Sequence, residues 1–461
     1  MKRIAILTAG GDTPALNATL FGAAARANER KIELFGLKRG YTSLFDDRVP
    51  HVCLNPLFST IPELDPNRGG TIIGSSRTYV DVSKKDQLDG IFRRLDKLQI
   101  DGLICVGGDG TLNGMQALCE RMPVVLAPKT IDNDLGLNYP TESNKWTRVD
   151  DPESESGYRY EVNDSSFVSA PCTIQLEQMV NYVTPGYATA VFVSTGGVNR
   201  IRTTAESHQR IAIVEVMGRH SGYIALGTAY GQPDLILVPE SPINVERLIE
   251  RVKEIYEVQK HVVIVCGEGI VDETGHVLGA SHASTDPSGN LILSGAAERL
   301  RQVLIDGIGD SFFDNRKASS AVFTRKVGHT QRGGRPIRFD RFHAAQLGGK
   351  AVDMLTAGEN NAVATLQWNH DKGFYLSSRD GNCFRDKYGV IHARELHPSF
   401  YDAEQMNISA TGVEYLLPIF TNAIGQDDIE NIRRTRFDSG RLFSRYHSIN
   451  VDMEKRLKFV D

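Results

Sequence analysis

Short apolar runs alternate with amphipathic segments along most of the chain. Apolar runs of about four to eight residues are typical of buried parallel strands, and apolar positions three and four apart are typical of helices that cover a sheet. The strands predicted in this way span residues 4–8, 32–37, 101–106, 124–127, 210–216, 234–238, 261–266 and 321–327. The predicted helices span residues 17–28, 84–98, about 184–206, 245–258, 293–305 and 344–355. This alternation indicates an α/β protein.

Two breaks in the alternation divide the chain. Residues 136–183 show no clean periodicity and contain the acidic, turn-forming stretch 150–156, so we expect a surface insertion there. Residues 357–461 form an extension of mixed character that includes a charged helical pattern at 430–443. The remaining α/β segments predict two lobes with a cleft between them. The predicted lobes consist of residues 1–135 with about 330–356, and of residues 184–329.

Composition narrows the class of protein. The chain has 461 residues, of which 41% are hydrophobic and 24% charged, as is ordinary for a globular protein of roughly two to three domains. Its net charge of −5 argues against a nucleic-acid or membrane-surface partner. No apolar run approaches the ~20 residues of a membrane span, and the apolar run at the start is too short for a signal peptide. Six cysteines occur without a CxxC pair, which predicts reduced thiols in the cytoplasm.

The candidate chemistry centres on residues 127–134, with the sequence APKTIDND, which leave the predicted strand 124–127. A lysine, a threonine and two aspartates crowd the carboxyl end of a strand, which is where ligands bind in open α/β sheets. Phosphoryl transfer needs such a set, because it requires a base for the attacking hydroxyl, a carboxylate near a metal ion and donors for the phosphate oxygens. The alternative is an Asx turn that only redirects the chain.

Three glycine-rich loops in the first part of the chain could bind phosphate, since small residues let backbone N–H groups approach an anion. They span residues 9–14, 67–77 and 107–111. Arg77 ends the second loop and is a candidate phosphate ligand. In the third loop, Asp109 could hold Mg²⁺ on a polyphosphate and Thr111 could donate its hydroxyl. Each loop alone could serve packing or capping only, but three together favour phosphate binding. Tyr41 could stack on a base or pack in the core.

The most basic stretch of the chain follows residues 321–327. It joins the motif GHTQRGG (328–334) to three further arginines at 335, 338 and 341. Only Phe339 and Phe342 are available as aromatic platforms, too few for nucleic acid to be the favoured ligand. A site for one phosphate monoester is the better interpretation, and a solvated basic face is the alternative.

Taken together, these motifs resemble the phosphofructokinase family. The resemblance covers about residues 1–135 and 184–356. It rests on GGDTPALN (10–17), GSSR (74–77), GGDGT (107–111), PKTIDND (128–134), ESHQRIAIVEVMGR (206–219), GE (267–268) and GHTQRGG (328–334). It implies two Rossmann-like three-layer lobes with the active site in the cleft. The first lobe would bind the phosphoryl donor and the second the sugar phosphate. The family moves a terminal phosphoryl group from ATP or pyrophosphate to the 1-hydroxyl of fructose 6-phosphate.

The resemblance also implies roles for individual residues. Asp132 would be the general base and Arg219 would stabilise charge on the transferring group. The implied catalytic residues are Asp132, Arg219, Thr130 and Lys129. The implied donor-binding residues are Gly11, Tyr41, Arg77, Gly108, Asp109, Gly110, Thr111 and Gly114. The implied substrate-binding residues are Thr130, Asp132, Asp134, Arg210, Met217, Gly218, Arg219, Glu268, Arg325, His329 and Arg332. The cofactor would be Mg²⁺ on Asp109 and Asp134. Arg210 often acts from a neighbouring subunit in this family, so a homodimer or homotetramer is expected.

Three departures from the family pattern affect these expectations. Pyrophosphate enzymes usually have aspartate at the position of Gly110 and lysine at that of Lys129, whereas short bacterial ATP enzymes have glycine at both. The mixed pair resembles the long ATP-using branch and favours ATP, with pyrophosphate as the alternative. A phosphate-binding arginine is replaced by Phe323, and Arg325, on the same face of the strand, could substitute for it. Effector-binding arginines of the first helix are absent.

Two rival interpretations fit the sequence less well. NAD kinases and lipid kinases share the GGDGT stretch but lack the TIDND, MGR and GHTQRGG stretches. A non-catalytic regulatory subunit would be expected to lose the base or the metal carboxylate, yet Asp132, Asp109 and Arg219 are all present.

Overall fold

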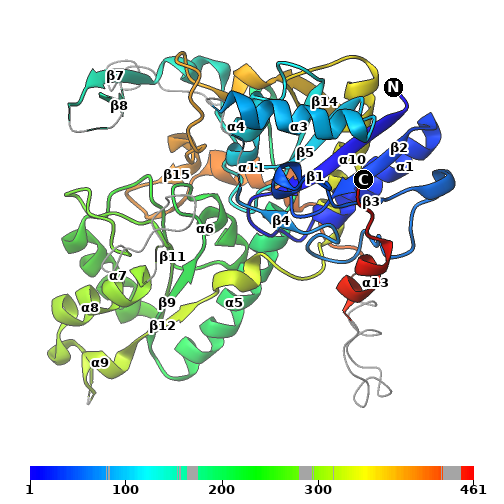
Figure 1. Cartoon of the computed structure of the whole chain (residues 1–461). Helices are drawn as coiled ribbons and strands as arrows, with labels where there is room; N and C mark the ends of the chain where they lie inside the picture. Colours follow the sequence, from blue (N-terminus) through cyan, green and yellow to red (C-terminus); the bar gives the residue numbers. More distant parts are fainter. Residues whose placement is uncertain are drawn as a thin grey trace.

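The computed structural model describes residues 1–461 except 79, 81–83, 153, 155–156, 163–174, 280–292, 294, 315, 427, 429–447 and 461. The helical pattern predicted at 430–443 lies outside the described residues. Figure 1 shows a larger lobe built mainly from the beginning of the chain and a smaller lobe built from its middle. The two-lobe α/β architecture predicted from the sequence is confirmed. In the described part of the chain, no helix has both the length and the apolar character needed to cross a bilayer.

A mainly parallel sheet forms the centre of the larger lobe. Its strands are β1 (Arg3–Ala9), β2 (Glu33–Leu37), β3 (His51–Cys53), β4 (Ser75–Ser76), β5 (Gly102–Gly107), β6 (Val124–Pro128), β13 (Ala362–Asn369) and β14 (Gly373–Asp380). Their order is β14-β13-β6-β5-β1-β2-β3, with β4 beside the end of β1. Because β1, β5 and β6 are parallel, the loops that leave their carboxyl ends meet at one edge of the sheet.

Helices cover both faces of this sheet. They are α1 (Leu16–Arg30), α2 (Thr42–Phe45), α3 (Lys85–Lys97), α4 (Asp109–Gln116) and α10 (Arg338–Thr356). Successive residues of β1 point into different core clusters, which is the alternation expected of a strand buried on both faces. Helices α1 and α10 approach so closely that a Cβ atom at Gly22 would lie 1.8 Å from the carbonyl oxygen of Ala345. Glycine is therefore required at this crossing.

A smaller parallel sheet forms the second lobe. Its strands are β9 (Ile211–Val216), β10 (Leu235–Leu237), β11 (Val262–Gly267) and β12 (Val322–Lys326), in the order β10-β11-β9-β12. Its helices are α5 (Tyr187–Ser207), α6 (Tyr223–Gly227), α7 (Val245–Gln259), α8 (Ala296–Ile308) and α9 (Ala318–Ala321). Every residue of β9 and β11 is buried, as the continuous apolar runs predicted. The carboxyl ends of these strands carry the loops 217–222, 267–269 and 327–334.

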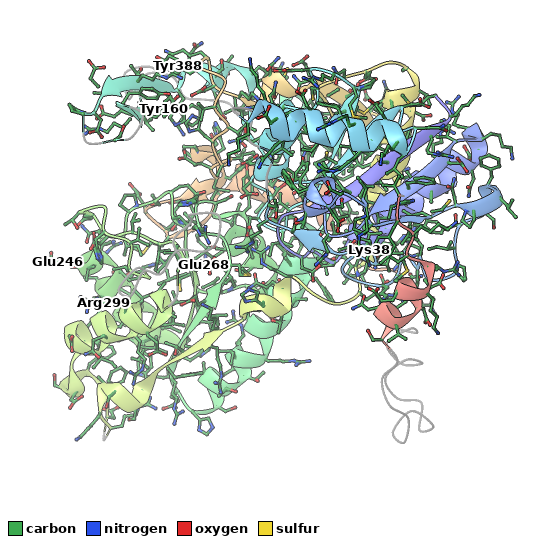
Figure 2. All side chains as sticks on the ribbon, viewed as in Figure 1. Lys38, Tyr160, Glu246, Glu268, Arg299 and Tyr388 are labelled. Carbon is green, nitrogen blue, oxygen red and sulfur yellow. The ribbon has the colours of Figure 1, made fainter. Side chains whose placement is uncertain are left out.

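The insertion and the C-terminal extension contain the remaining elements. These are β7 (Trp146–Asp150), β8 (Tyr158–Val162), β15 (Tyr401–Asp402), β16 (Asn407–Ile408), α11 (Ala410–Phe420) and α13 (Ile449–Arg456). The short 3₁₀ turns are η1 (Pro56–Phe58), η2 (Pro140–Asn144), η4 (Leu176–Gln178), η5 (Thr228–Gly231), η6 (Asp310–Phe312), η7 (Gly328–Gln331), η8 (Gly381–Phe384) and η9 (Pro398–Phe400). The β7–β8 hairpin projects from the larger lobe, where Tyr160 lies beside Tyr388 (Figure 2), with ring centroids 5.8 Å apart. The insertion therefore packs on the extension.

The extension is not separate from the first lobe. Strand β13 pairs in parallel with β6, and β14 pairs antiparallel with β13, so the extension begins by completing the larger sheet. Helix α10 begins at Arg338, six residues before the predicted start. In its first turn the Arg338 N–H donates to Asp428 at 3.1 Å and Arg341 pairs with the same carboxylate at 2.8 Å, contacts that stabilise this end of the helix. Residues that follow β14 then run between the lobes.

Glu240 marks the point at which the extension meets the smaller lobe. Its Oε1 accepts hydrogen bonds from the backbone N–H of Gly222 at 2.8 Å and of Leu396 at 2.6 Å. Burial raises the pKa of Glu240 to about 7, although these hydrogen bonds oppose the shift. Between pH 4.5 and about pH 7, Glu240 is protonated in the folded protein but ionised in the unfolded chain. The free energy of unfolding therefore falls as the pH rises through this range.

The variant Glu240→Gln should therefore be more stable than the native protein at pH 8, by about 1–3 kcal/mol, and equal to it near pH 4.5. Glutamine keeps an oxygen for both N–H groups and removes the buried charge. Thermal unfolding from pH 5 to pH 8 measures the difference. Glu254→Gln, on the exposed face of α7, serves as the control and should show no such dependence. A pH-independent difference for Glu240→Gln would contradict the expectation.

Candidate active site

The turn after β6 is held by its own side chains. Thr130 Oγ1 donates to Asp134 Oδ1 at 2.8 Å and accepts from the backbone N–H of Asp132 at 3.1 Å. Asn133 adopts the left-handed conformation (φ 57°), which asparagine tolerates better than most residues. The Lys129 N–H bonds to the Gly107 carbonyl at 2.9 Å, which fixes the turn to the neighbouring loop. Thr130 therefore braces the two aspartates in one compact turn.

Asp132 lies where the two lobes meet. Its Oδ2 is 3.7 Å from Arg332 Nη2, and its carbonyl oxygen accepts from Ser221 Oγ of the smaller lobe at 3.3 Å. Its Oδ1 is enclosed and has no hydrogen-bond partner in the described part of the structure. Burial, followed by repulsion from Asp134, raises the pKa of Asp132 to about 7, against the attraction of Arg332. A carboxylate with such a pKa is suited to take up and release a proton near neutral pH.

Lys129 and Arg332 connect this turn to the first glycine loop. Lys129 Nζ donates to the carbonyl oxygen of Gly11. A Cβ atom at Gly11 would lie 2.9 Å from Arg332 Nη1, so the guanidinium packs directly on this glycine. Burial, and then the charge of Arg332, lowers the pKa of Lys129 to about 7, while Asp12 opposes the shift. Three motifs far apart in sequence therefore meet around Asp132.

A cavity of about 650 Å³ opens beside these residues. Its lining consists of Gly10, Gly11, Asp12, Ser75, Ser76, Arg77 and Thr78. The loop that carries Arg77 is tied to the first glycine loop, because the Gly10 N–H donates to the Ser76 carbonyl at 2.9 Å and Ser75 Oγ donates to the Gly10 carbonyl at 2.8 Å. The cavity has the polar backbone groups and the arginine that a polyphosphate requires.

The third glycine loop forms the start of α4. A Cβ atom at Gly108 would lie 3.7 Å from the Lys129 carbonyl oxygen, so this loop runs alongside the turn after β6. Gly110 is exposed, and a Cβ atom built on it meets nothing within 4 Å. Asp109 Oδ1 accepts from the N–H of Gly136 at 3.0 Å, and burial together with the charge of Asp134 raises the Asp109 pKa well above its usual range.

Asp109 and Asp134 are near enough to influence each other, and together they fit a metal that is completed by phosphate oxygens. Mg²⁺ is commonly held by one or two carboxylates, several waters and substrate phosphates. Among the described residues, no group of three or more histidine, cysteine, aspartate or glutamate side chains is arranged to enclose a metal by itself. The two carboxylates thus suit Mg²⁺ that arrives with a polyphosphate.

Three residues that the resemblance assigns to donor binding are buried in the structure: Tyr41, Gly114 and Thr111. Tyr41 is 1% exposed and its hydroxyl donates to the Thr111 carbonyl at 2.9 Å, so the ring cannot stack on a base. Gly114 does not line the cavity, since it is buried and a Cβ atom there would lie 3.0 Å from the Tyr41 ring. Thr111 is also buried, and its hydroxyl lies against Gly107. Sequence alone could not separate these core contacts from a binding role.

The sugar-side residues lie on loops of the smaller lobe. The Met217 N–H donates to Gln331 Oε1 at 3.3 Å, and Gly218 has a φ of 121° that only glycine adopts readily. A Cβ atom at Gly269 would lie 1.8 Å from the Arg219 carbonyl oxygen, so the loops 217–219 and 267–269 are in contact. The charges of Arg219 and Glu268 both act on Asp132. Figure 2 shows Glu268 on the side of the smaller lobe that faces the larger one.

The arginines of the basic stretch do not form a single site. Arg332 reaches Asp132, whereas Arg335 and Arg341 pair with Asp428 at 3.4 and 2.8 Å and serve packing. His329 and Arg325 are both exposed, on η7 and on the edge strand β12 respectively.

Arg210 precedes β9 and lies at its amino end, about 20 Å of strand from Met217 at the other end. It cannot reach the site of its own chain.

The sequence matches the phosphofructokinase family model over residues 3–141 and 153–355. It is 30% identical to the ATP-dependent 6-phosphofructokinase of Natranaerobius thermophilus, over 80% of this chain and 90% of the relative. It is 32% identical to a pyrophosphate–fructose 6-phosphate 1-phosphotransferase of Amycolatopsis methanolica, over 79% of this chain and 90% of the relative.

Solved structures support the fold. A pyrophosphate-dependent phosphofructokinase from Marinobacter aquaeolei superimposes with a TM-score of 0.66 at 18% identity, covering 92% of this chain and 95% of that structure. Phosphofructokinase from Saccharomyces cerevisiae gives a TM-score of 0.57 at 20% identity, covering 82% of this chain and 44% of that structure. The motifs, the two-lobe fold and these matches agree, and the chain belongs to the phosphofructokinase family.

Proposed function

We propose that this protein transfers the γ-phosphoryl group of ATP to the 1-hydroxyl of fructose 6-phosphate, giving fructose 1,6-bisphosphate. The observation that carries the proposal is the placement of Asp132. Among the described residues its Oδ1 has no hydrogen-bond partner, and its Oδ2 lies 3.7 Å from Arg332, which packs on Gly11 of the donor side. A base in this position can serve a hydroxyl that attacks a phosphate bound in the adjoining cavity.

In the proposed mechanism, Asp132 accepts the proton of the 1-hydroxyl as the oxygen attacks the terminal phosphorus. Arg219 and Lys129 supply positive charge around the transferring group, and this charge favours the transition state. Asp109 and Asp134 would hold Mg²⁺, which when bound neutralises negative charge on the phosphate oxygens. The bond from phosphorus to the β-phosphate oxygen breaks, ADP leaves, and Asp132 returns its proton to solvent.

Pyrophosphate is the second candidate donor. The presence of Lys129 beside Gly11 favours it, because an ammonium there suits a small, highly charged donor. Gly110 favours ATP, since the space beside it would accommodate a nucleotide's α-phosphate. Rates measured with fructose 6-phosphate and Mg²⁺, with either ATP or pyrophosphate, decide between them. We expect ATP to be the better donor, and the absence of product with both donors would contradict the proposal.

The remaining assignments extend the same proposal. His329 and Arg332 would bind the 6-phosphate, and Arg325 could assist them from the end of β12. Arg210 would act in the site of a neighbouring copy, which makes a homodimer or homotetramer the expected assembly. The cytoplasmic location stays a prediction from the sequence.

A further inference from the structure

One buried arginine of the C-terminal extension lies directly beneath the catalytic turn. Arg394 belongs to the segment that follows β14, outside the residues matched by the family model. Its side chain is 2% exposed, which is unusual for an arginine. No motif in this part of the sequence indicates a role for Arg394.

The contacts of Arg394 are concentrated on the turn that carries Asp132. Its backbone N–H donates to the Asp134 carbonyl at 2.7 Å, and its Nε donates to the Asn133 carbonyl at 2.8 Å. Nη1 donates to the Asn181 carbonyl at 2.5 Å. The guanidinium also lies over the Tyr223 ring, 4.8 Å from its centroid. It thus joins the catalytic turn to the insertion and to the smaller lobe.

The residues that follow Arg394 are also fixed by hydrogen bonds. The Asn138 side-chain amide donates to the Glu395 carbonyl at 2.9 Å, and the Leu396 N–H donates to Glu240. On the other side of the turn, Asn133 Nδ2 donates to the Tyr415 hydroxyl at 2.7 Å. The extension therefore forms hydrogen bonds with the turn on two sides.

Burying the Arg394 guanidinium in these contacts costs free energy. The guanidinium contacts carbonyl oxygens and a ring face instead of a carboxylate, so its buried charge is balanced only by dipoles and by more distant charges. Its planar fork can donate to carbonyls on two segments at once, which lysine cannot do with the same geometry. An arginine at this position can therefore hold the catalytic turn in one orientation, and this role accounts for the buried charge.

We infer that Arg394 is a positioning residue for the catalytic turn, and that the C-terminal extension is therefore an integral part of the active site. The inference rests on the proposed function in so far as Asp132 is the base. Loss of the guanidinium should let the turn at 132–134 move while leaving the sugar-phosphate contacts of the smaller lobe in place. A displacement of about 1 Å at a reacting group can cost about 10²-fold in rate.

The test compares Arg394→Met and Arg394→Lys with the native protein. We expect kcat to fall about 100-fold in Arg394→Met while KM for fructose 6-phosphate stays within about threefold. Arg394→Lys should recover part of the lost kcat, because one hydrogen bond and the charge remain. The control is Tyr401→Phe, which removes a partly buried hydrogen bond of the extension, to the Ile236 carbonyl at 2.7 Å, away from the turn. It should lower the melting temperature and leave kcat unchanged.

Hydrogen exchange of the amides at 130–136 supplies a readout that does not require activity. These amides should exchange faster in both Arg394 variants and at the native rate in Tyr401→Phe. Native exchange in the Arg394 variants would overturn the inference, as would a native kcat in folded Arg394→Lys and Arg394→Met. If Arg394→Met does not fold, kcat and hydrogen exchange are both measured on Arg394→Lys. A native protein that is inactive with either donor would refute the proposed function, and the exchange result would still decide the role of Arg394.

Discussion

Asp132→Asn should lower kcat by about 10²–10⁴-fold without unfolding the protein. Asparagine matches aspartate in shape, and the Ser221 hydroxyl bonds to the backbone carbonyl of residue 132, which the substitution leaves in place. The asparagine side chain cannot, however, accept the proton of the attacking hydroxyl. Because Arg332 and Arg219 remain, binding of fructose 6-phosphate should persist. The loss should therefore fall on kcat, with KM little changed.

A coupled assay for ADP formation measures this effect, together with thermal unfolding to verify that the variant is folded. Asp353→Asn is the matched control, since it makes the same chemical change in α10, where Asp353 pairs with Arg26 and Arg30 on the surface. We expect the control to retain kcat within about twofold. A kcat within tenfold of the native value in Asp132→Asn would exclude a general-base role.

The fold could be predicted from the sequence wherever strands are buried on both faces. Strand β6 is an example, because its run from Val124 to Ala127 is fully buried and its carboxyl end leads straight into the catalytic turn. Parallel strands bring their loops to one edge, so the meeting of this turn with Gly11 and Gly108 follows from topology. Arg332, from the basic stretch, lies 3.7 Å from Asp132, and parallel topology likewise places η7 near the catalytic turn.

Residues whose role depends on distant packing could not be predicted. Tyr41 follows the turn residues Arg39 and Gly40, as a base-stacking tyrosine could, yet it is covered by α4. Arg335 and Arg341 belong to a basic run that suggests an anion site, but their partner Asp428 lies some ninety residues later in the chain. Arg394 sits in a segment without periodicity, and its burial is decided by Asn133, Asn181 and Tyr223 together. Such contacts leave no local pattern.

Gly110→Asp should abolish most activity with ATP while leaving the fold intact. A Cβ atom at this position meets nothing within 4 Å, and α4 begins here, so a carboxylate is sterically accepted and is favoured by the helix dipole. The same open space is the one that the family resemblance implies for the α-phosphate of ATP. Two negative charges about 4 Å apart near a protein surface repel by roughly 4 kcal/mol, which corresponds to about a 10³-fold loss.

Gly110→Ala and Gly110→Asn separate size from charge. We expect little change with alanine, an intermediate loss of kcat/KM for ATP with asparagine, and the largest loss, about 10²–10³-fold, with aspartate. Pyrophosphate lacks an α-phosphate, so any activity with this donor should be less affected by aspartate than activity with ATP. Because KM for fructose 6-phosphate depends on the other lobe, it serves as the internal control. Unchanged ATP kinetics in Gly110→Asp would show that the nucleotide does not occupy this space, and the choice of donor would then have to depend on Lys129.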